Sequence, residues 1–145
     1  PGEVYGILAA PPCRVFCRPG ARLWTEWGDE QLLDGLSIVD ACLRLVAMCK
    51  PKFWALENPP GRFNKFLGPP RYSFHPYHHG DPWTKHTYLW GRFNNPARNE
   101  VTPESYPEHL PPGRRDKTSR MSSTARNERS QTPTGFAKAF FEANQ

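Results

Sequence analysis

The N-terminal half of the chain combines short apolar runs with one amphipathic segment. Residues 4–10 are mostly apolar and are followed by Pro11-Pro12. This is typical of a buried strand that ends abruptly, because proline cannot continue a central ladder. Leucine and valine then recur at three- and four-residue steps across residues 30–50, which predicts a helix with Asp29 as its N-cap. A strand followed by a helix therefore opens the predicted fold.

A second apolar run follows the predicted helix. Residues 53–56 predict another buried strand, which is closed by Glu57-Asn58-Pro59. The order strand, helix, strand predicts a βαβ unit with two parallel strands. Ligands bind outside the carboxyl ends of such strands. We therefore expect Cys13 and Glu57 to face one pocket at the same edge of the sheet.

The C-terminal half is predicted to be richer in loops. Residues 61–84 carry prolines, glycines and histidines and predict loops, whereas residues 86–93 predict a third strand. A C-terminal helix is predicted to start with Thr132 as its cap and Pro133 at the first helical position. The chain thus divides into three parts: residues 1–93 with both polar strand ends, residues 94–131 as a basic, proline-rich loop region, and residues 132–145 as a helix that packs back on the core.

Composition narrows the class of protein. The chain has 145 residues, of which 17 are prolines and 13% are aromatic, which favours one loop-rich domain over global disorder. No apolar run is long enough to span a bilayer, and no secretory signal is recognised. The four cysteines are accordingly expected as reduced thiols. A formal net charge of +5 is compatible with a polyanionic partner.

Three motifs, in their order along the chain, resemble those of the C5-cytosine DNA methyltransferases, in particular small phage-type members. They are Pro12-Cys13 after the first strand, Glu57-Asn58 after the second, and residues 80–91, which read Gly-Asp-Pro-Trp-Thr-Lys-His-Thr-Tyr-Leu-Trp-Gly. Residues 132–137 resemble the last motif of that family. The resemblance implies an α/β fold with a partial, loop-rich Rossmann-like class I methyltransferase core of parallel strands and flanking helices.

The resemblance also implies a reaction. S-adenosylmethionine would donate a methyl group to C5 of a cytosine flipped out of DNA, in the cytoplasm of a bacterial or phage-infected cell and in a restriction–modification context. Addition of the Cys13 thiolate to C6 would activate C5, and Arg14 and Arg18 are expected to lower the pKa of Cys13. A protonated Glu57 with a raised pKa would hydrogen-bond N3 of the base. Asn58 would order the turn or contact the base or Glu57.

The chain departs from the family pattern in two ways. Lys85 matches the first arginine of the third motif, but Thr87 stands where the family has a second arginine that points at the base. Lys85, Arg62 or Arg92 would have to supply that charge. The glycine-rich turn and the acidic residue that bind the cofactor should precede the first strand, and neither is found. An upstream segment or a partner chain is therefore expected to complete the cofactor site.

The remaining candidates form three groups. The residues expected beside the cofactor are Pro11, Pro12, Thr134, Gly135 and Phe136. Those expected to bind nucleic acid are Arg14, Arg18, Arg62, Arg114, Arg115 and Arg120. No metal site is predicted, because the histidines at positions 75, 78, 79 and 86 lack the paired ligand spacing of zinc sites. DNA is the expected partner, and no membrane partner is expected.

Other interpretations of the same residues stay open. Glu57-Asn58 is also compatible with an ordinary strand-end turn. The missing front end and Thr87 favour a catalytically incomplete methyltransferase fold that only binds nucleic acid. A third alternative is a methyltransferase that acts on an exocyclic amino group of DNA, for which Cys13 would be dispensable.

Overall fold

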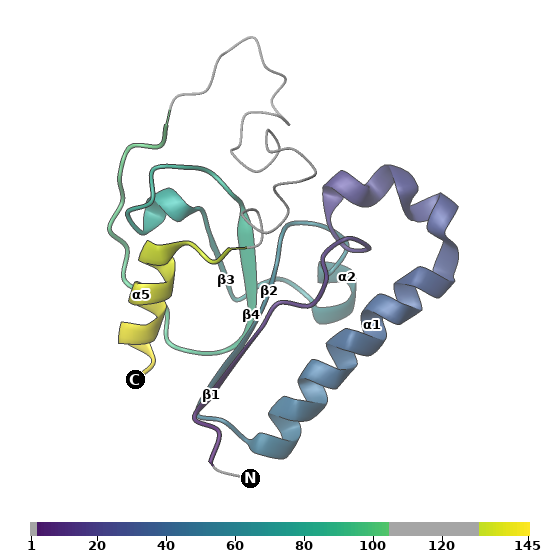
Figure 1. Ribbon diagram of the computed structural model, residues 1–145, viewed down its shortest axis with the longest axis horizontal. Coiled ribbons are helices and arrows are strands. Elements are labelled where there is room, and N and C mark those ends of the chain that lie inside the picture. Colours follow the sequence, from purple (N-terminus) through teal and green to yellow (C-terminus); the bar gives the residue numbers. More distant parts are fainter. Residues whose placement is uncertain (1–2, 105–130) are drawn as a thin grey trace. The chain divides into compact units, whose positions relative to one another are not determined.

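The computed structural model describes residues 3–104 and 131–145. The chain has a mixed α/β fold with a four-stranded sheet in the order β1-β2-β4-β3 (Figure 1). The strands are β1 (Gly6–Ala9), β2 (Phe53–Asn58), β3 (Tyr72–Phe74) and β4 (Thr87–Arg92).

The sheet is parallel at one end only. β1 and β2 are parallel, with Ile7 opposite Trp54, which confirms the predicted parallel pair. β4 runs antiparallel to β2, with Leu56 opposite Trp90, so the sheet is mixed and the expected core of parallel strands is present only in part. A parallel return needs a crossover of a dozen or more residues, usually a helix. The only α-helix described between these two strands is the one-turn α2 (Asn64–Leu67), which is too short for such a crossover.

The predicted helix between β1 and β2 is longer than expected. α1 spans Trp24–Cys49 and is preceded by the 3₁₀ helix η1 (Arg18–Leu23). Gly28 interrupts α1 with φ 61° and ψ −167°, so the predicted start near Asp29 corresponds to the part after this kink. The helix ends as predicted, because Lys50 adopts the left-handed conformation and Pro51 follows it.

Aromatic side chains dominate the core beneath α1. The Phe16 and Phe63 rings meet edge-on at 4.7 Å, and Phe63 meets Trp90 in the same way at 4.9 Å. The buried members of this core cluster are Val15, Phe16, Val39, Leu56, Phe63 and Trp90. The segment that follows Cys13 is therefore part of the core and is not a loose loop.

The chain forms two compact units. The first comprises Pro1–Ser73 and Thr87–Phe93, and the second comprises Phe74–His86 and Asn94–Gln145. The second unit contains η2 (Pro76–His78) and α5 (Thr134–Ala143). Residues 61–84, expected as loops, thus also contain α2, β3 and η2.

α5 begins one residue later than predicted. Its N-cap is Pro133, so Thr132 does not cap it. The Gly135 N–H instead donates to the Asp81 carboxylate at 2.9 Å, which satisfies one of the free N–H groups at the helix start. Gly135 is required there, because a Cβ atom would overlap the His79 carbonyl oxygen.

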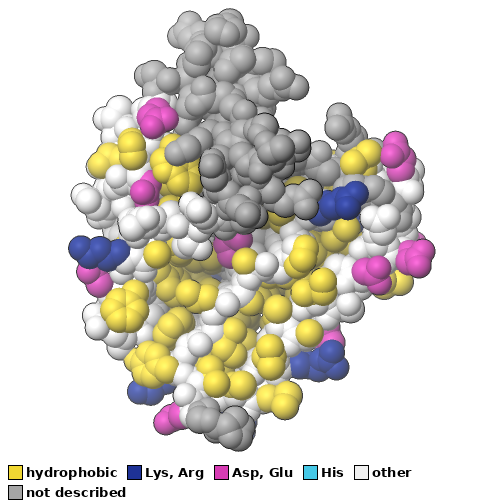
Figure 2. Space-filling view, viewed as in Figure 1, with side chains coloured by type: hydrophobic (Ala, Val, Ile, Leu, Met, Phe, Trp, Pro, Cys, Tyr) yellow, Lys and Arg dark blue, Asp and Glu magenta, His cyan; other side chains and the backbone are white. Residues whose placement is uncertain are grey.

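Part of the apolar surface of the first unit is exposed. β1 stands at the end of the strand order, and the Leu8 side chain in it is 66% exposed. Figure 2 shows hydrophobic side chains gathered over the region where Figure 1 labels β1. Tyr5 and Met48 are also exposed. Within residues 3–104 and 131–145, no helix has the length and apolar character that a membrane span requires.

Candidate active site at the ends of β1 and β2

Cys13 opens a tight turn directly after β1. The N–H groups of Phe16 and Cys17 both donate to the Cys13 carbonyl, at 2.9 and 2.8 Å. Pro11 and Pro12 end the strand at this point because neither can donate to a ladder. The turn presents Cys13 on the surface, whereas Cys17 is buried.

The segment after β2 holds this turn in place. The Arg18 N–H donates to the Pro60 carbonyl at 3.2 Å, and the Arg62 N–H donates to the Phe16 carbonyl at 2.8 Å. Between these two bonds, any side chain on Gly61 would overlap the Phe16 carbonyl oxygen. The loops that leave the two parallel strands therefore lie in direct backbone contact.

Asn58 joins the two strand ends. It is fully buried, and its Nδ2 donates to the Pro11 carbonyl at 3.0 Å. Its Oδ1 has no hydrogen-bond partner among the described residues. Of the roles predicted for Asn58, the structure shows the ordering of the turn. A fully buried amide is poorly placed to meet a base.

Cys13 and Glu57 are brought together at this edge of the sheet. The hydrogen bond with the Cys17 thiol raises the pKa of Cys13 most, followed by burial of its sulfur and by the charges of Cys17 and Glu57. The sulfur is thus partly shielded, although the residue as a whole is exposed. The lowered pKa expected from Arg14 and Arg18 was wrong, because the charges that act on Cys13 are negative. Both arginines are exposed.

Arg62 supports the Cys13 turn from within. Its Nε donates to the Val15 carbonyl at 2.6 Å, and its guanidinium lies 4.4 Å from the centre of the Trp24 ring. Its Nη2 is buried and has no hydrogen-bond partner among the described residues. The predicted nucleic-acid contact of Arg62 stays a prediction, whereas its contacts within the first unit are structural.

The cations proposed to replace the missing arginine lie in different places. Thr87 is buried and precedes Tyr88, the partner of Asn58 in the sheet, so it lies at the same end of the sheet as Asn58. Arg92 lies at the other end, where it donates to the Pro51 carbonyl at 2.7 Å. Arg92 therefore cannot replace the arginine at Thr87. Lys85 belongs to the second unit.

Some of the other predicted site residues make contacts within their own unit, and others lie outside the described residues. The Gly135 N–H is bonded to Asp81, and the Phe136 ring is buried and stacked on Phe74 at 4.0 Å. Thr134 and Pro12 are exposed, and Pro11 is buried. These groups do not by themselves fit a binding site for S-adenosylmethionine. Outside the described residues lie Arg114, Arg115 and Arg120.

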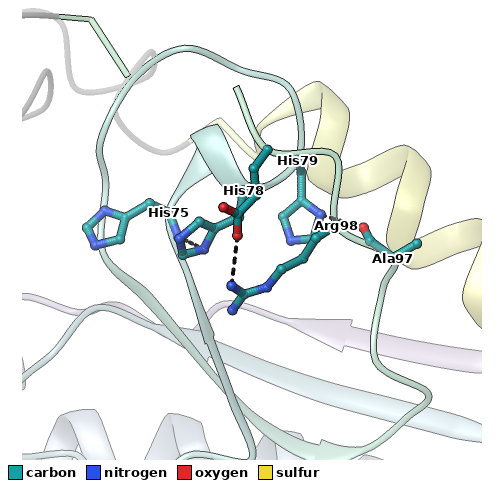
Figure 3. A network of polar contacts seen from close by, with 6 residues as sticks. His75, His78, His79, Ala97 and Arg98 are labelled. Atoms are coloured by element: carbon teal, nitrogen blue, oxygen red, sulfur yellow. Dashed lines mark hydrogen bonds and ion pairs between the residues drawn. The ribbon is translucent and has the colours of Figure 1, made fainter. Parts of the chain in front are cut away.

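The histidines of the second unit pack on one another. The His75 ring stacks on His86 at 4.6 Å and on Tyr77 at 5.4 Å. The His75 N–H donates to the Nδ1 of His78 at 3.1 Å (Figure 3). Among the described residues, no three side chains of histidine, cysteine, aspartate or glutamate are grouped as metal ligands. The cluster thus resembles a small aromatic core.

His79 is the buried member of this group. Its Nδ1 lies 2.9 Å from the Ala97 carbonyl oxygen (Figure 3), so the neutral ring donates from Nδ1 there. Burial lowers the pKa of His79 and, together with the charge of Arg98, that of His78. Both rings are therefore favoured in their neutral form.

Cys17 escaped the sequence analysis as part of the site, and Arg62 was predicted there in a different role. Cys17 follows Cys13 by four residues, a spacing that places two side chains on one face of a helical turn. Arg62 follows a glycine at a strand end, where a close backbone approach is common.

Comparisons with protein families, with curated proteins and with solved structures gave no match to this chain.

Proposed function

We propose that this chain carries the base-side chemistry of a cytosine-C5 DNA methyltransferase-like protein. The observation that carries the proposal is the meeting of Cys13 and Glu57 at the ends of two adjacent parallel strands, close enough for the charge of Glu57 to act on the thiol. A nucleophile and an acid at one sheet edge suit attack on a heteroaromatic ring.

The proposed step is addition to the pyrimidine. The Cys13 thiol passes its proton to the Glu57 carboxylate, its sulfur forms a bond to C6, and the electron pair of the C5–C6 double bond moves toward C5. Glu57, now protonated, donates a hydrogen bond to N3 and stabilises the charge that develops on the ring. Because C6 is covered in stacked DNA, the cytosine must leave the helix first.

The raised pKa of Cys13 sets a condition on this step. The thiol keeps its proton near neutral pH, and the thiolate is the attacking form. Addition therefore needs Glu57 as the acceptor of this proton. Asn58 and Arg62 contribute by holding the turn, since they bond the carbonyls of Pro11 and Val15.

The methyl donor needs residues beyond those described. S-adenosylmethionine would supply the methyl group for C5, but the candidate residues do not fit a site for it. We propose that an upstream segment or a partner chain completes a Rossmann-like sheet beside β1. The position of β1 at the end of the strand order and the exposure of Leu8 support this.

A base analogue tests the base-side chemistry without a cofactor. A set of oligonucleotides with randomised flanks carries 2-pyrimidinone in place of one cytosine, because this ring is more electrophilic at C6. We expect a covalent adduct on Cys13, detected by denaturing electrophoresis and peptide mass. Cys13→Ala should abolish the adduct, and Cys42→Ser should retain it. No adduct, or an unchanged adduct in Cys13→Ala, contradicts the proposal.

A second function, nucleic-acid binding without catalysis, is favoured by Thr87. This buried residue stands where the resembling family has an arginine, and a hydroxyl cannot supply that charge. Calorimetry separates the two functions. Salt-dependent binding of duplex DNA with no adduct on Cys13 indicates the binding module.

A further inference from the structure

The thiols of Cys13 and Cys17 lie together in the turn that follows β1. The Cys17 N–H donates to the Cys13 carbonyl at 2.8 Å, and the Cys17 side chain is the neighbour that raises the pKa of Cys13 most. In a turn of this α-helical type, the Cα atoms of residues i and i+4 are about 6 Å apart. Disulfides span Cα separations of about 4.4–6.8 Å. We infer that Cys13 and Cys17 form a reversible disulfide bond that masks the candidate nucleophile.

The two thiols differ in their access to solvent. Cys13 is exposed, whereas Cys17 is buried and only 8% exposed. A small oxidised molecule therefore meets Cys13 first, and Cys17 is placed to attack the sulfur of Cys13 afterwards. The backbone around Cys17 is fixed by its bridge to Gly61, so the second thiol is held near the first.

Thiol–disulfide exchange supplies the chemistry. The Cys13 thiolate attacks one sulfur of a low-molecular-weight disulfide such as oxidised glutathione, forms a mixed disulfide and releases one thiol. The Cys17 thiolate then attacks the Cys13 sulfur and releases the second thiol. The two cysteines together lose two protons and two electrons, and the small disulfide is reduced to two thiols. Excess small thiol reverses both steps.

The other two cysteines provide an internal control. Cys42 and Cys49 lie seven residues apart on α1, and seven residues of α-helix rise about 10 Å. This exceeds the span of a disulfide. A disulfide between Cys42 and Cys49 is therefore excluded in the folded chain.

Oxidation would switch the site off. In the disulfide form the Cys13 sulfur cannot become a thiolate, which is the form that adds to a base, so no adduct forms. This regulatory half of the inference rests on the proposed function. Formation of the disulfide does not, and it is measured without nucleic acid.

The experiment uses the full chain with Cys42→Ser and Cys49→Ser, in buffers of graded reduced and oxidised glutathione. After rapid alkylation, we expect intact mass spectrometry to show a species that lacks two hydrogens and takes up no alkylating agent. Peptide mapping should assign the bond to Cys13 and Cys17. Dithiothreitol should restore two alkylatable thiols.

Two further variants decide the outcome. Cys17→Ser should stop at the mixed disulfide on Cys13, and Cys13→Ser, a change at an exposed position, should form neither species under the same buffers. Persistence of only a mixed disulfide in the parent chain, or a disulfide that joins two chains instead, overturns the inference. An adduct on reduced Cys13 without any disulfide would refute the inference and leave the proposed function standing.

Discussion

The turn after β1 and the two ends of α5 both bring distant residues together, but they use their polar groups differently. At α5, the Gly135 N–H is bonded to Asp81, and Asn144 donates to the Asn94 carbonyl at 3.1 Å and to the Phe140 carbonyl at 2.8 Å. After β1, by contrast, buried polar atoms of Asn58 and Arg62 have no partner among the described residues.

The difference separates a scaffold from a candidate site. Buried polar groups are normally hydrogen-bonded, and exceptions call for an explanation. The polar groups at α5 are used to hold the second unit together. The turn after β1 combines unmet hydrogen-bonding capacity with an exposed thiol and a carboxylate. This combination points to chemistry at the turn and to a purely structural role at α5.

The largest expected effect comes from the glycines that both regions require. Gly61→Ala and Gly135→Ala each place a Cβ atom on a carbonyl oxygen, of Phe16 and of His79 respectively. We expect each to lower the free energy of unfolding by about 3 kcal/mol, measured by denaturant titration. Only Gly61→Ala should also abolish the Cys13 adduct where the variant stays folded. Equal loss of adduct in both variants would erase the distinction between the regions.

Removal of the Asn58 side chain should have the next largest effect. Asn58→Ala deprives the buried Pro11 carbonyl of its donor and should cost about 2 kcal/mol of unfolding free energy. The matched control is Asn64→Ala, a change at an exposed asparagine that should cost less than about 0.5 kcal/mol. Similar costs in the two variants would show that Asn58 does not join the strand ends.

The smallest effect concerns the pH dependence of the second unit. The pKa values of His78 and His79 are lowered in the folded chain, so the unfolded chain binds more protons as the pH falls through the ordinary histidine range. Stability should therefore be present above about pH 6.5 and decline below it. Thermal melts of His79→Asn, which keeps a donor for Ala97, should show a weaker decline. An unchanged decline would contradict this assignment.

The sequence predicted the elements that depend on local pattern. The parallel strands β1 and β2 were predicted from two apolar runs on either side of one amphipathic segment. Their polar ends were predicted from the residues that come directly after each run. It did not predict the cap of α5, because Asp81 is 54 residues from Gly135. Nor did it predict that Arg62 would support the Cys13 turn, since that contact joins residues 47 apart. Such contacts depend on tertiary packing and leave no local periodicity.

The pKa of Cys13 is a second property that the sequence did not predict. Two arginines near Cys13 in the sequence suggested a lowered pKa, but the hydrogen bond with the Cys17 thiol, burial and the charge of Glu57 raise it. Proximity along the chain was therefore a poor guide to electrostatics at a turn, because the direction of each side chain decides which charge acts.

The central claim is that Cys13 and Glu57 act on one base, and Glu57→Gln tests it most directly. Removal of the Glu57 charge should lower the pKa of Cys13 and speed its alkylation by iodoacetamide at pH 7, by about twofold or more. The same variant should slow adduct formation with the 2-pyrimidinone oligonucleotides, because the protonated carboxyl is lost. Glu26→Gln, on α1, serves as the control and should change neither rate. Opposite changes in the two rates are the predicted result; unchanged alkylation, or faster alkylation with equally faster adduct formation, would contradict the account.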